Sequence, residues 1–364
     1  MSIRPKTLFV LKYRETGEGP YSTNWGDGNG KFLSSGLYNS ARMVVEMLTE
    51  QGFEAKLVHV PDNNAIHKEI VEFGADHVII EAFWVVPQKF DELTRVCPNV
   101  KFTIRNHSET PFLANEGIAF DWALRYIMTP NVYFSCNSER SLREMRLLIK
   151  AHTGWSDAEV EERTPFLPNY YPLDDVRAKR RGRHSKKEVH IGCFGAVRPL
   201  KNHMMQAIAA IAYAMKHKLK LSFHINGGRI EGGGDPILKN LRQMFAKFPD
   251  YKLVEHAWCP HDVFKNLVIS KMDFVMQVSF SETFNIVAAD AATMGIPLVT
   301  SSEVMWNSRF LYADPTSTQS ILAALERAAL VQTWCSTGTN PSYRGLKRYD
   351  RISVENWTEY LENS

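Results

Sequence analysis

Short runs of β-branched and aromatic residues alternate with amphipathic helical stretches along most of this 364-residue chain. Such alternation is typical of βα units, which build a parallel sheet whose strands are buried on both faces. The expected strands are 7–13, 55–60, 77–83, 101–105 and 131–135, then 189–194, 220–225, 252–256, 273–278 and 297–300. The main expected helices are 35–51, 139–150, 202–217, 236–248, 261–270, 284–294 and 352–361. The pattern predicts an α/β protein.

The length and one break in this pattern predict two domains. A chain of 364 residues is long enough for two separate cores. Between 171 and 187 the apolar periodicity disappears, and a new strand begins immediately afterwards. We expect a first domain over 1–175, a linker over 176–187, a second domain over 188–340 and a segment over 341–364 that crosses back to the first domain. The predicted architecture is two Rossmann-like domains facing a central cleft, with ligands at the carboxyl ends of the strands.

The composition excludes several classes of protein. Apolar residues make up 44% and charged residues 23% of the chain, and no apolar run approaches the roughly 20 residues that a membrane-spanning helix needs. The first residues show no secretory signal, so we expect a cytoplasmic protein. The five cysteines include no C-x-x-C pair and accompany no histidine cluster, which favours buried free thiols and indicates no metal site.

The positive charge is concentrated in one segment. The stretch from Arg177 to Lys187 holds seven of the 43 Lys and Arg and no acid, so the remaining 36 cations and 40 acids leave the rest of the chain at −4. This stretch is either a solvated linker or a contact for the phosphate backbone of a nucleic acid. The expected helix 139–150 also carries several cations. Its apolar side either packs on its own domain, which we favour, or faces an anionic membrane surface.

The loop after the strand 189–194 predicts an anion site. Gly195 permits a close approach of the backbone, and Arg198 and Lys201 stand three residues apart at the start of the next helix. Two such cations could hold one diphosphate through charge-assisted hydrogen bonds. The alternative is an ordinary solvated helix start.

A second junction carries two acids around a helix start. Glu282 precedes the expected helix 284–294, and Asp290 lies eight residues later inside it. The backbone N–H groups between them, over Thr283, Phe284, Asn285 and Ile286, would face an anion at the helix N-terminus. Taken singly, either acid would be a capping or surface residue. Together they match a ligand in which a diphosphate separates two groups that carry hydroxyls.

These residues resemble the motifs of the family-four-like retaining glycosyltransferases, which have the GT-B fold. The resemblance covers most of the second half of the chain. Gly195, Arg198, Lys201 and Asn202 resemble the donor-phosphate motif of that family, in which the Arg and Lys bind the diphosphate. Glu282 and Asp290 resemble its Glu-x7-Glu motif, whose first acid contacts the donor sugar and whose second binds the ribose. Asp290 is one methylene shorter than the family's glutamate. Trp258 falls where the family contacts the nucleobase, or is an ordinary core aromatic residue.

The first half resembles the same family more loosely. Its glycine-rich first loop is similar to Asp27-Gly28-Asn29-Gly30 and Ser34-Ser35-Gly36-Leu37, and Gly36 is our candidate donor contact there. His107, after the strand 101–105, falls where the family has an active-site histidine near the donor sugar, although a lone histidine is often structural. The pair Pro168-Asn169 resembles the turn that precedes the family's interdomain linker.

The resemblance implies a metal-independent, retaining transfer of a sugar from a nucleotide-diphosphate donor, of UDP type, with no further cofactor. His107, Glu282, Arg198 and Lys201 are the expected catalytic residues. The expected acceptor is a hydroxyl, either on a hydroxymethylated DNA base or on a lipid or saccharide at a membrane surface. Another hypothesis is a degenerate protein that binds nucleotide sugars without turnover. A nicotinamide-dependent dehydrogenase is disfavoured, because neither half shows Gly-x-Gly-x-x-Gly between a strand and a helix.

Overall fold

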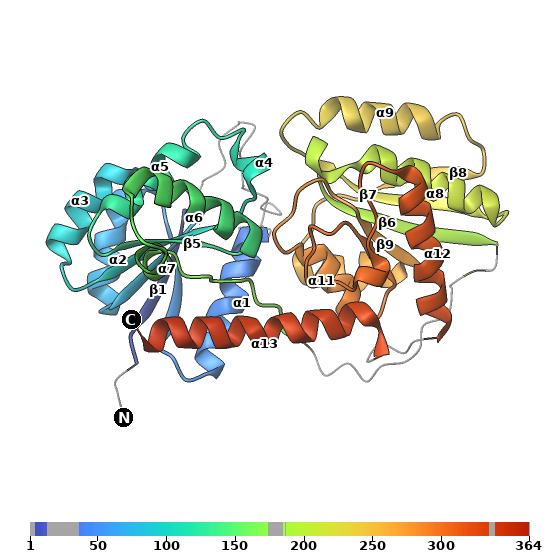
Figure 1. The fold of residues 1–364 in the computed structure, drawn as a ribbon. Helices are drawn as coiled ribbons and strands as arrows, with labels where there is room; N and C mark the ends of the chain where they lie inside the picture. Colours follow the sequence, from blue (N-terminus) through green and yellow to red (C-terminus); the bar gives the residue numbers. More distant parts are fainter. Residues whose placement is uncertain (1–3, 13–35, 174–184, 186, 335–338, 364) are drawn as a thin grey trace. The chain divides into compact units, whose positions relative to one another are not determined.

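The computed structural model describes residues 4–12, 36–173, 185, 187–334 and 339–363. Its contacts divide the chain into two compact units, each with one five-stranded sheet (Figure 1). Unit 1 comprises residues 1–17, 35–172 and 350–364, and unit 2 comprises residues 18–34 and 173–349. Nearly all of the basic stretch 177–187, and the glycine-rich first loop up to residue 35, lie outside the described residues.

The sheet of unit 1 is entirely parallel, in the order β2-β1-β3-β4-β5. Its strands are β1 (Thr7–Lys12), β2 (Ala55–Val60), β3 (His77–Glu81), β4 (Lys101–Asn106) and β5 (Val132–Cys136). Leu8 and Val10 pack into one core, and Phe9 between them packs into another. The strand is therefore buried on both faces, which is why it appears in the sequence as a continuous apolar run.

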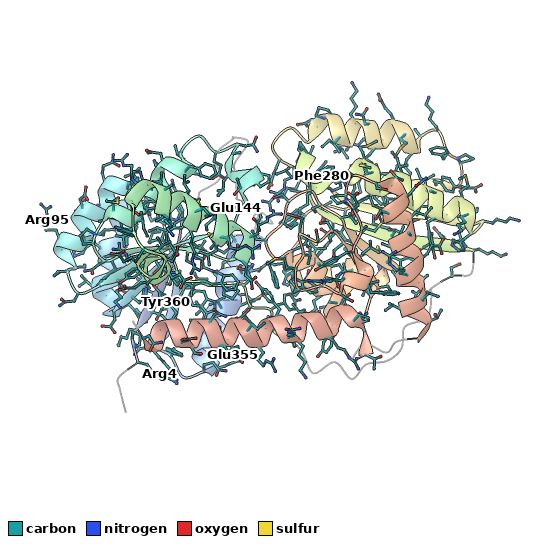
Figure 2. All side chains as sticks on the ribbon, in the orientation of Figure 1. Arg4, Arg95, Glu144, Phe280, Glu355 and Tyr360 are labelled. Carbon is teal, nitrogen blue, oxygen red and sulfur yellow. The ribbon has the colours of Figure 1, made fainter. Side chains whose placement is uncertain are left out.

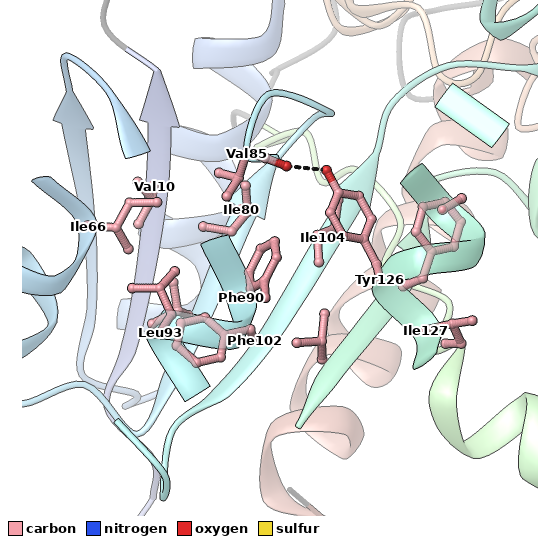
Figure 3. Packing of buried hydrophobic residues seen from close by; sticks show 14 of the residues in the cluster. Val10, Ile66, Ile80, Val85, Phe90, Leu93, Phe102, Ile104, Tyr126 and Ile127 are labelled. Atoms are coloured by element: carbon pink, nitrogen blue, oxygen red, sulfur yellow. Dashed lines mark hydrogen bonds between the residues drawn. The ribbon is translucent and has the colours of Figure 1, made fainter. Parts of the chain in front are cut away.

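Helices supply the partners for both cores of this sheet. They are α1 (Gly36–Glu50), α2 (Ile66–Phe73), α3 (Pro87–Val96), α4 (Thr110–Leu113), α5 (Ala119–Met128), α6 (Glu139–Thr153), α7 (Asp157–Arg163) and the second part of α13 (Pro341–Glu362). In one core the ring of Phe90 meets Phe102 and Tyr126 edge-on, and the Tyr126 hydroxyl donates to the Val85 carbonyl (Figure 3). These contacts fix α3 and α5 against β4.

Helix α6 also packs on unit 1. Leu142, Met145 and Ile149 are buried in the same core as β4 and β5. The interpretation that we favoured for the apolar side of this helix is therefore confirmed, and that side is not available to a membrane surface.

The sheet of unit 2 repeats the architecture, with parallel strands in the order β10-β9-β6-β7-β8. The strands are β6 (Glu188–Val197), β7 (Lys220–Ile230), β8 (Tyr251–Glu255), β9 (Phe274–Gln277) and β10 (Leu298–Thr300). Strands β6 and β7 run further than predicted. Their pairing shifts register between Ala196, which faces Asn226, and Val197, which faces Ile230. This irregular extension carries the chain past the edge of the sheet at which ligands bind in parallel folds.

The helices of unit 2 correct two of the sequence predictions. They are α8 (His203–Lys216), α9 (Asp235–Phe245), α10 (His261–Val263), α11 (Ile286–Thr293), α12 (Thr318–Trp334) and the first part of α13. The expected helix 261–270 is instead α10 followed by a π-helical segment, Phe264–Val268, and a 3₁₀ turn, Ile269–Lys271. The expected start of α11 at residue 284 was two residues early, because Asn285 caps this helix.

The last helix begins at Pro341, eleven residues before its predicted start at 352. Proline is well placed in the first turn of a helix, because its missing N–H would have no partner there. Gly345 lies inside the helix, where an added Cβ would collide with the Trp306 carbonyl oxygen. Pro341 is therefore the start of this helix, and Gly345 is a site of close packing within it. From Asp350 onward the helix belongs to unit 1.

The described cysteines are free, as predicted. Cys97, Cys136 and Cys193 are buried, and Cys259 is partly exposed. Burial raises the pKa of Cys136 and of Cys193 to about 12, so both are neutral thiols. None of the helices in the described part of the chain is both long and apolar enough to span a bilayer.

Candidate functional site

The carboxyl end of β6 passes Lys201 at a glycine. Gly195 has a φ of +108°, and an added Cβ would stand 3.3 Å from the Lys201 Cε. Its N–H donates to Asn226 Oδ1 at 2.9 Å, which ties the end of β6 to β7. Because a side chain would be both strained and crowded at this position, glycine is what lets the lysine lie along the strand end.

Lys201 pairs with Glu282, the first acid of the second junction. The ammonium contacts Glu282 Oε1, and the two side chains are 11% and 8% exposed. The N–H of Phe280, labelled in Figure 2, donates to the Leu200 carbonyl at 2.9 Å and holds the two loops together. The structure thus brings together three of the predicted residues, Gly195, Lys201 and Glu282.

Asn202 has a different place from the one expected. It adopts a left-handed conformation with a φ of +57°, and its amide donates to the carbonyls of Val278 and Pro315 at 3.1 and 2.8 Å. The Asn202 side chain is buried, and these two hydrogen bonds join the loops around the site. The next residue, His203, is also buried, and its ring nitrogens find no partner among the described residues. Burial, and then the charges of Lys201 and Arg198, lower the pKa of His203 to about 3, so this ring is neutral.

Arg198 belongs to a second charged group, which the sequence did not reveal. Its Nη1 lies 3.7 Å from Glu231 Oε2, while Arg229 places Nε and Nη2 at 2.6 and 2.5 Å from Glu231 Oε1. The Arg229 guanidinium stands over the Trp258 ring, 4.4 Å from its centroid. One carboxylate therefore holds two arginines, and the predicted diphosphate cation is linked to the predicted nucleobase contact.

The start of α11 is set by Asn285 and not by Phe284. Asn285 has a φ of +67°, accepts the Ala288 N–H at its Oδ1, and donates from Nδ2 to Gln277 Oε1. The Phe284 ring is buried against Trp306, whose indole N–H donates to the Phe284 carbonyl at 2.7 Å. Phe284 is thus a core residue, and the N–H groups of the first helical turn begin at Ile286. Thr283 and Ile286 are partly exposed.

Asp290 is not exposed at the surface of the helix. Its side chain is fully buried and its Oδ1 lies 2.7 Å from His261 Nε2. The imidazole of His261 is 17% exposed, so within this pair solvent reaches the histidine and not the acid. The predicted direct contact of Asp290 with ribose hydroxyls is not available in this arrangement.

In unit 1, His107 belongs to a buried charged network. Its Nε2 contacts Glu81 at the end of β3, and Glu81 also lies 3.2 Å from Arg105 of β4. Arg105 in turn donates to the carbonyls of Leu167 and Pro168, both at 2.9 Å. Burial works to raise the pKa of Glu81, but Arg105 and His107 outweigh it and hold this pKa below its usual value.

His107 itself is held neutral. Burial lowers its pKa, and this outweighs the opposing charge of Glu81. With Glu81 ionised, His107 Nε2 is the donor to it, and Nδ1 faces the Asn137 amide at 3.4 Å. Both ring nitrogens therefore have protein neighbours. Gly36, the other candidate in this unit, is exposed at the first residue of α1.

No family model and no curated sequence matches this chain. Several solved structures, in contrast, are similar to it. HepE of Anabaena, solved in complex with UDP, is 12% identical, with a TM-score of 0.60 over 99% of this chain and 100% of that one. The N-terminal domain of trehalose-6-phosphate phosphatase from Candida albicans is 8% identical, with a TM-score of 0.67 over 100% and 97%. A UDP-forming α,α-trehalose-phosphate synthase from Burkholderia xenovorans is 11% identical, with a TM-score of 0.62 over 83% and 77%.

The chain has the GT-B fold. At these identities the likeness concerns the fold alone. It confirms the predicted two-domain α/β architecture, in which each GT-B domain carries a parallel sheet. Within the described residues, no group of three or more His, Cys, Asp or Glu is arranged to hold a metal ion; the metal-independent reaction stays a prediction.

Several residues of the charged groups in these two units were not predicted from the sequence. Glu81 and Arg105 lie at or near the ends of strands that were predicted. No fixed spacing in the sequence, however, marks a buried ion pair between neighbouring strands. Arg229 and Glu231 lie in the unpredicted extension of β7 and in the residue after it. His261 was placed in an expected helix. Its position three residues after Trp258, in the loop that follows β8, was the signal that could have identified it.

Proposed function

We propose that this protein is a retaining glycosyltransferase that moves a sugar from a nucleotide-diphosphate donor to a hydroxyl acceptor. The observation that carries the proposal is the contact between Lys201 and Glu282 beside Gly195, at the carboxyl edge of the second sheet. Motif residues 81 positions apart meet there, as a donor site of this fold requires.

The reaction breaks the bond between the anomeric carbon and a diphosphate oxygen. The acceptor oxygen forms the new bond and loses its proton, while negative charge develops on the leaving diphosphate. Lys201, Arg198 and the N–H groups at the start of α11 would stabilise that charge. Glu282, which holds Lys201, would bind a sugar hydroxyl.

The nucleoside end of the donor would meet His261 and not Asp290. His261 is the exposed member of the pair, and Asp290 fixes its ring by a hydrogen bond of 2.7 Å. In this proposal Asp290 acts through the histidine, which compensates for the shorter acid.

The proposed donor is of UDP type, supported by the neighbours whose structures contain UDP or that are described as UDP-forming. The role that the resemblance gives His107, beside the donor sugar, stays a prediction. Two acceptors remain as predictions, a hydroxymethylated DNA base and a lipid or saccharide at a membrane surface. The segment 177–187, on which the nucleic-acid hypothesis depends, lies largely outside the described residues.

The test measures turnover and product mass. The full chain is incubated with UDP-, GDP- and ADP-sugars and with pools of saccharides, lipids and hydroxymethylated DNA. Release of a nucleoside diphosphate together with a glycosylated product is the expected result, and Lys201→Ala should abolish it. Lys239→Ala, an exposed lysine on α9, is the matched control. Binding without transfer or donor hydrolysis would establish the degenerate binding protein instead, and full activity in Lys201→Ala would refute the site.

A further inference from the structure

Arg229 lies where three loops of unit 2 meet. It is next to last in β7, beyond the last pairing of that strand with β8, between Ile225 and Glu255. At its neighbour Gly228 an added Cβ would stand 3.3 Å from Ala257 Cα and 3.4 Å from Trp258 N. The end of β7 therefore runs directly against the loop after β8, and Arg198 joins this group from the loop after β6 through Glu231.

Two arginines of this group share one acidic partner. Glu231 is a single carboxylate that holds Arg229 at 2.5 Å and Arg198 at 3.7 Å. The three side chains are only 17 to 30% exposed. Two partly buried guanidinium groups thus meet at one carboxylate, and a ligand that accepts hydrogen bonds would find strong, charge-assisted donors here.

Two donors in this group also have no acceptor. Arg229 uses Nε and Nη2 on Glu231, and its Nη1 makes no hydrogen bond among the described residues. Trp258 Nε1 is buried and likewise unpartnered there. Both groups can only donate, and leaving the buried indole N–H of Trp258 unpaired is costly. The arrangement calls for a ligand that presents acceptors.

We propose that Arg229, positioned by Glu231, is a donor-specificity residue that reads the carbonyl edge of the nucleobase, with Trp258 Nε1 as a second donor. The inference rests on the proposed function. A flat base fits this group because a guanidinium stacked on an indole presents flat faces. Uracil and guanine carry carbonyl oxygens that accept from a guanidinium, whereas adenine presents an amino group at the corresponding edge.

Calorimetric titration of the full chain with UDP, GDP, ADP and inorganic pyrophosphate tests this. We expect the wild type to bind UDP or GDP more tightly than ADP. Arg229→Met, which keeps an apolar stem over Trp258, should weaken the preferred nucleotide about 10- to 100-fold, the loss expected for one charge-assisted hydrogen bond. It should leave ADP and pyrophosphate nearly unchanged. Arg229→Lys, which keeps the charge but loses the planar fork, should lose the same selectivity.

The matched control is Arg327→Met on α12, because Arg327 also stands over an aromatic ring, Phe310, and bonds backbone carbonyls. It should bind every probe as the wild type does. Equal weakening of pyrophosphate and UDP in Arg229→Met would make Arg229 a phosphate ligand and overturn the inference, as would unchanged selectivity in both Arg229 variants. A wild type that binds no nucleotide would refute the proposed function itself, and the inference with it.

Discussion

Asp350 provides a quantitative test of the packing of α13 on unit 1. The residue is only 4% exposed, and its Oδ1 accepts the Tyr171 N–H at 3.1 Å. Oδ2 has no partner among the described residues. Burial raises the pKa of Asp350 from 3.8 to about 8, and the hydrogen bond from Tyr171 only partly opposes this. Asp350→Asn keeps an oxygen for that bond and removes the ionisation.

The sign of the effect follows from linkage. The folded state binds the proton of Asp350 more tightly than the unfolded state, so this group's contribution to stability is present below pH 4 and is lost as the pH rises to about 8. At about 1.4 kcal/mol per pH unit, the three units between pH 5 and pH 8 correspond to about 4 kcal/mol. The free energy of unfolding of Asp350→Asn, relative to the wild type, should therefore increase by about this amount over the interval.

Urea unfolding at half-unit steps from pH 5 to pH 8 measures this difference. Histidines with lowered pKa values, such as His77 and His224, titrate in both proteins and cancel when the two curves are subtracted. Asp121→Asn, at an exposed carboxylate on α5, controls for a simple change of charge. Parallel stability curves for the wild type and Asp350→Asn would refute the reasoning, because they would mean that Asp350 has the same proton affinity in both states.

Three further predictions concern the candidate site and the network of unit 1. Gly195→Val forces a branched side chain into a left-handed conformation and against Lys201, so it should lower the free energy of unfolding by about 1–3 kcal/mol and weaken UDP binding, measured by urea unfolding and calorimetry. His261→Ala should remove a preference of about 3- to 10-fold for UDP over its 2′- or 3′-deoxy analogues; an undiminished preference would show that the ribose contact lies elsewhere. Arg105→Met leaves Glu81 as a buried carboxylate without its main counter-charge, and urea unfolding should show a loss of about 3–5 kcal/mol.

The sheets could be predicted because strands buried on both faces leave a local signature. Each expected strand corresponds to a strand among the described residues, with ends that differ by a few residues. The extension of β7 through Asn226, Gly227 and Gly228 could not be predicted, since this composition is typical of a turn. Its strand conformation depends on the pairing of Val197 with Ile230, a contact between distant parts of the chain.

The predicted helix boundaries were wrong where the type of a single residue fitted two different structural roles. Phe284 looked like the first apolar residue of α11, but its ring is buried against Trp306, and the cap is the asparagine after it. Asparagine is a common capping residue, so the sequence did contain the signal. Glycine is a poor helix former, and only the nearby Trp306 carbonyl explains why Gly345 lies within α13.

The cations of the proposed donor site could be predicted from the sequence, but their acidic partners could not. Lys201 and Arg198 follow a strand end in a recognisable motif, whereas the acids that hold them come from other loops, 81 residues away for Glu282 and 33 for Glu231. A cation that is only 11 or 23% exposed loses much of its hydration and needs such a partner before any ligand arrives. A diphosphate entering this site must therefore compete with Glu282 and Glu231 for the same cations. Because the diphosphate would be held through the charges of these cations, added salt should weaken donor binding.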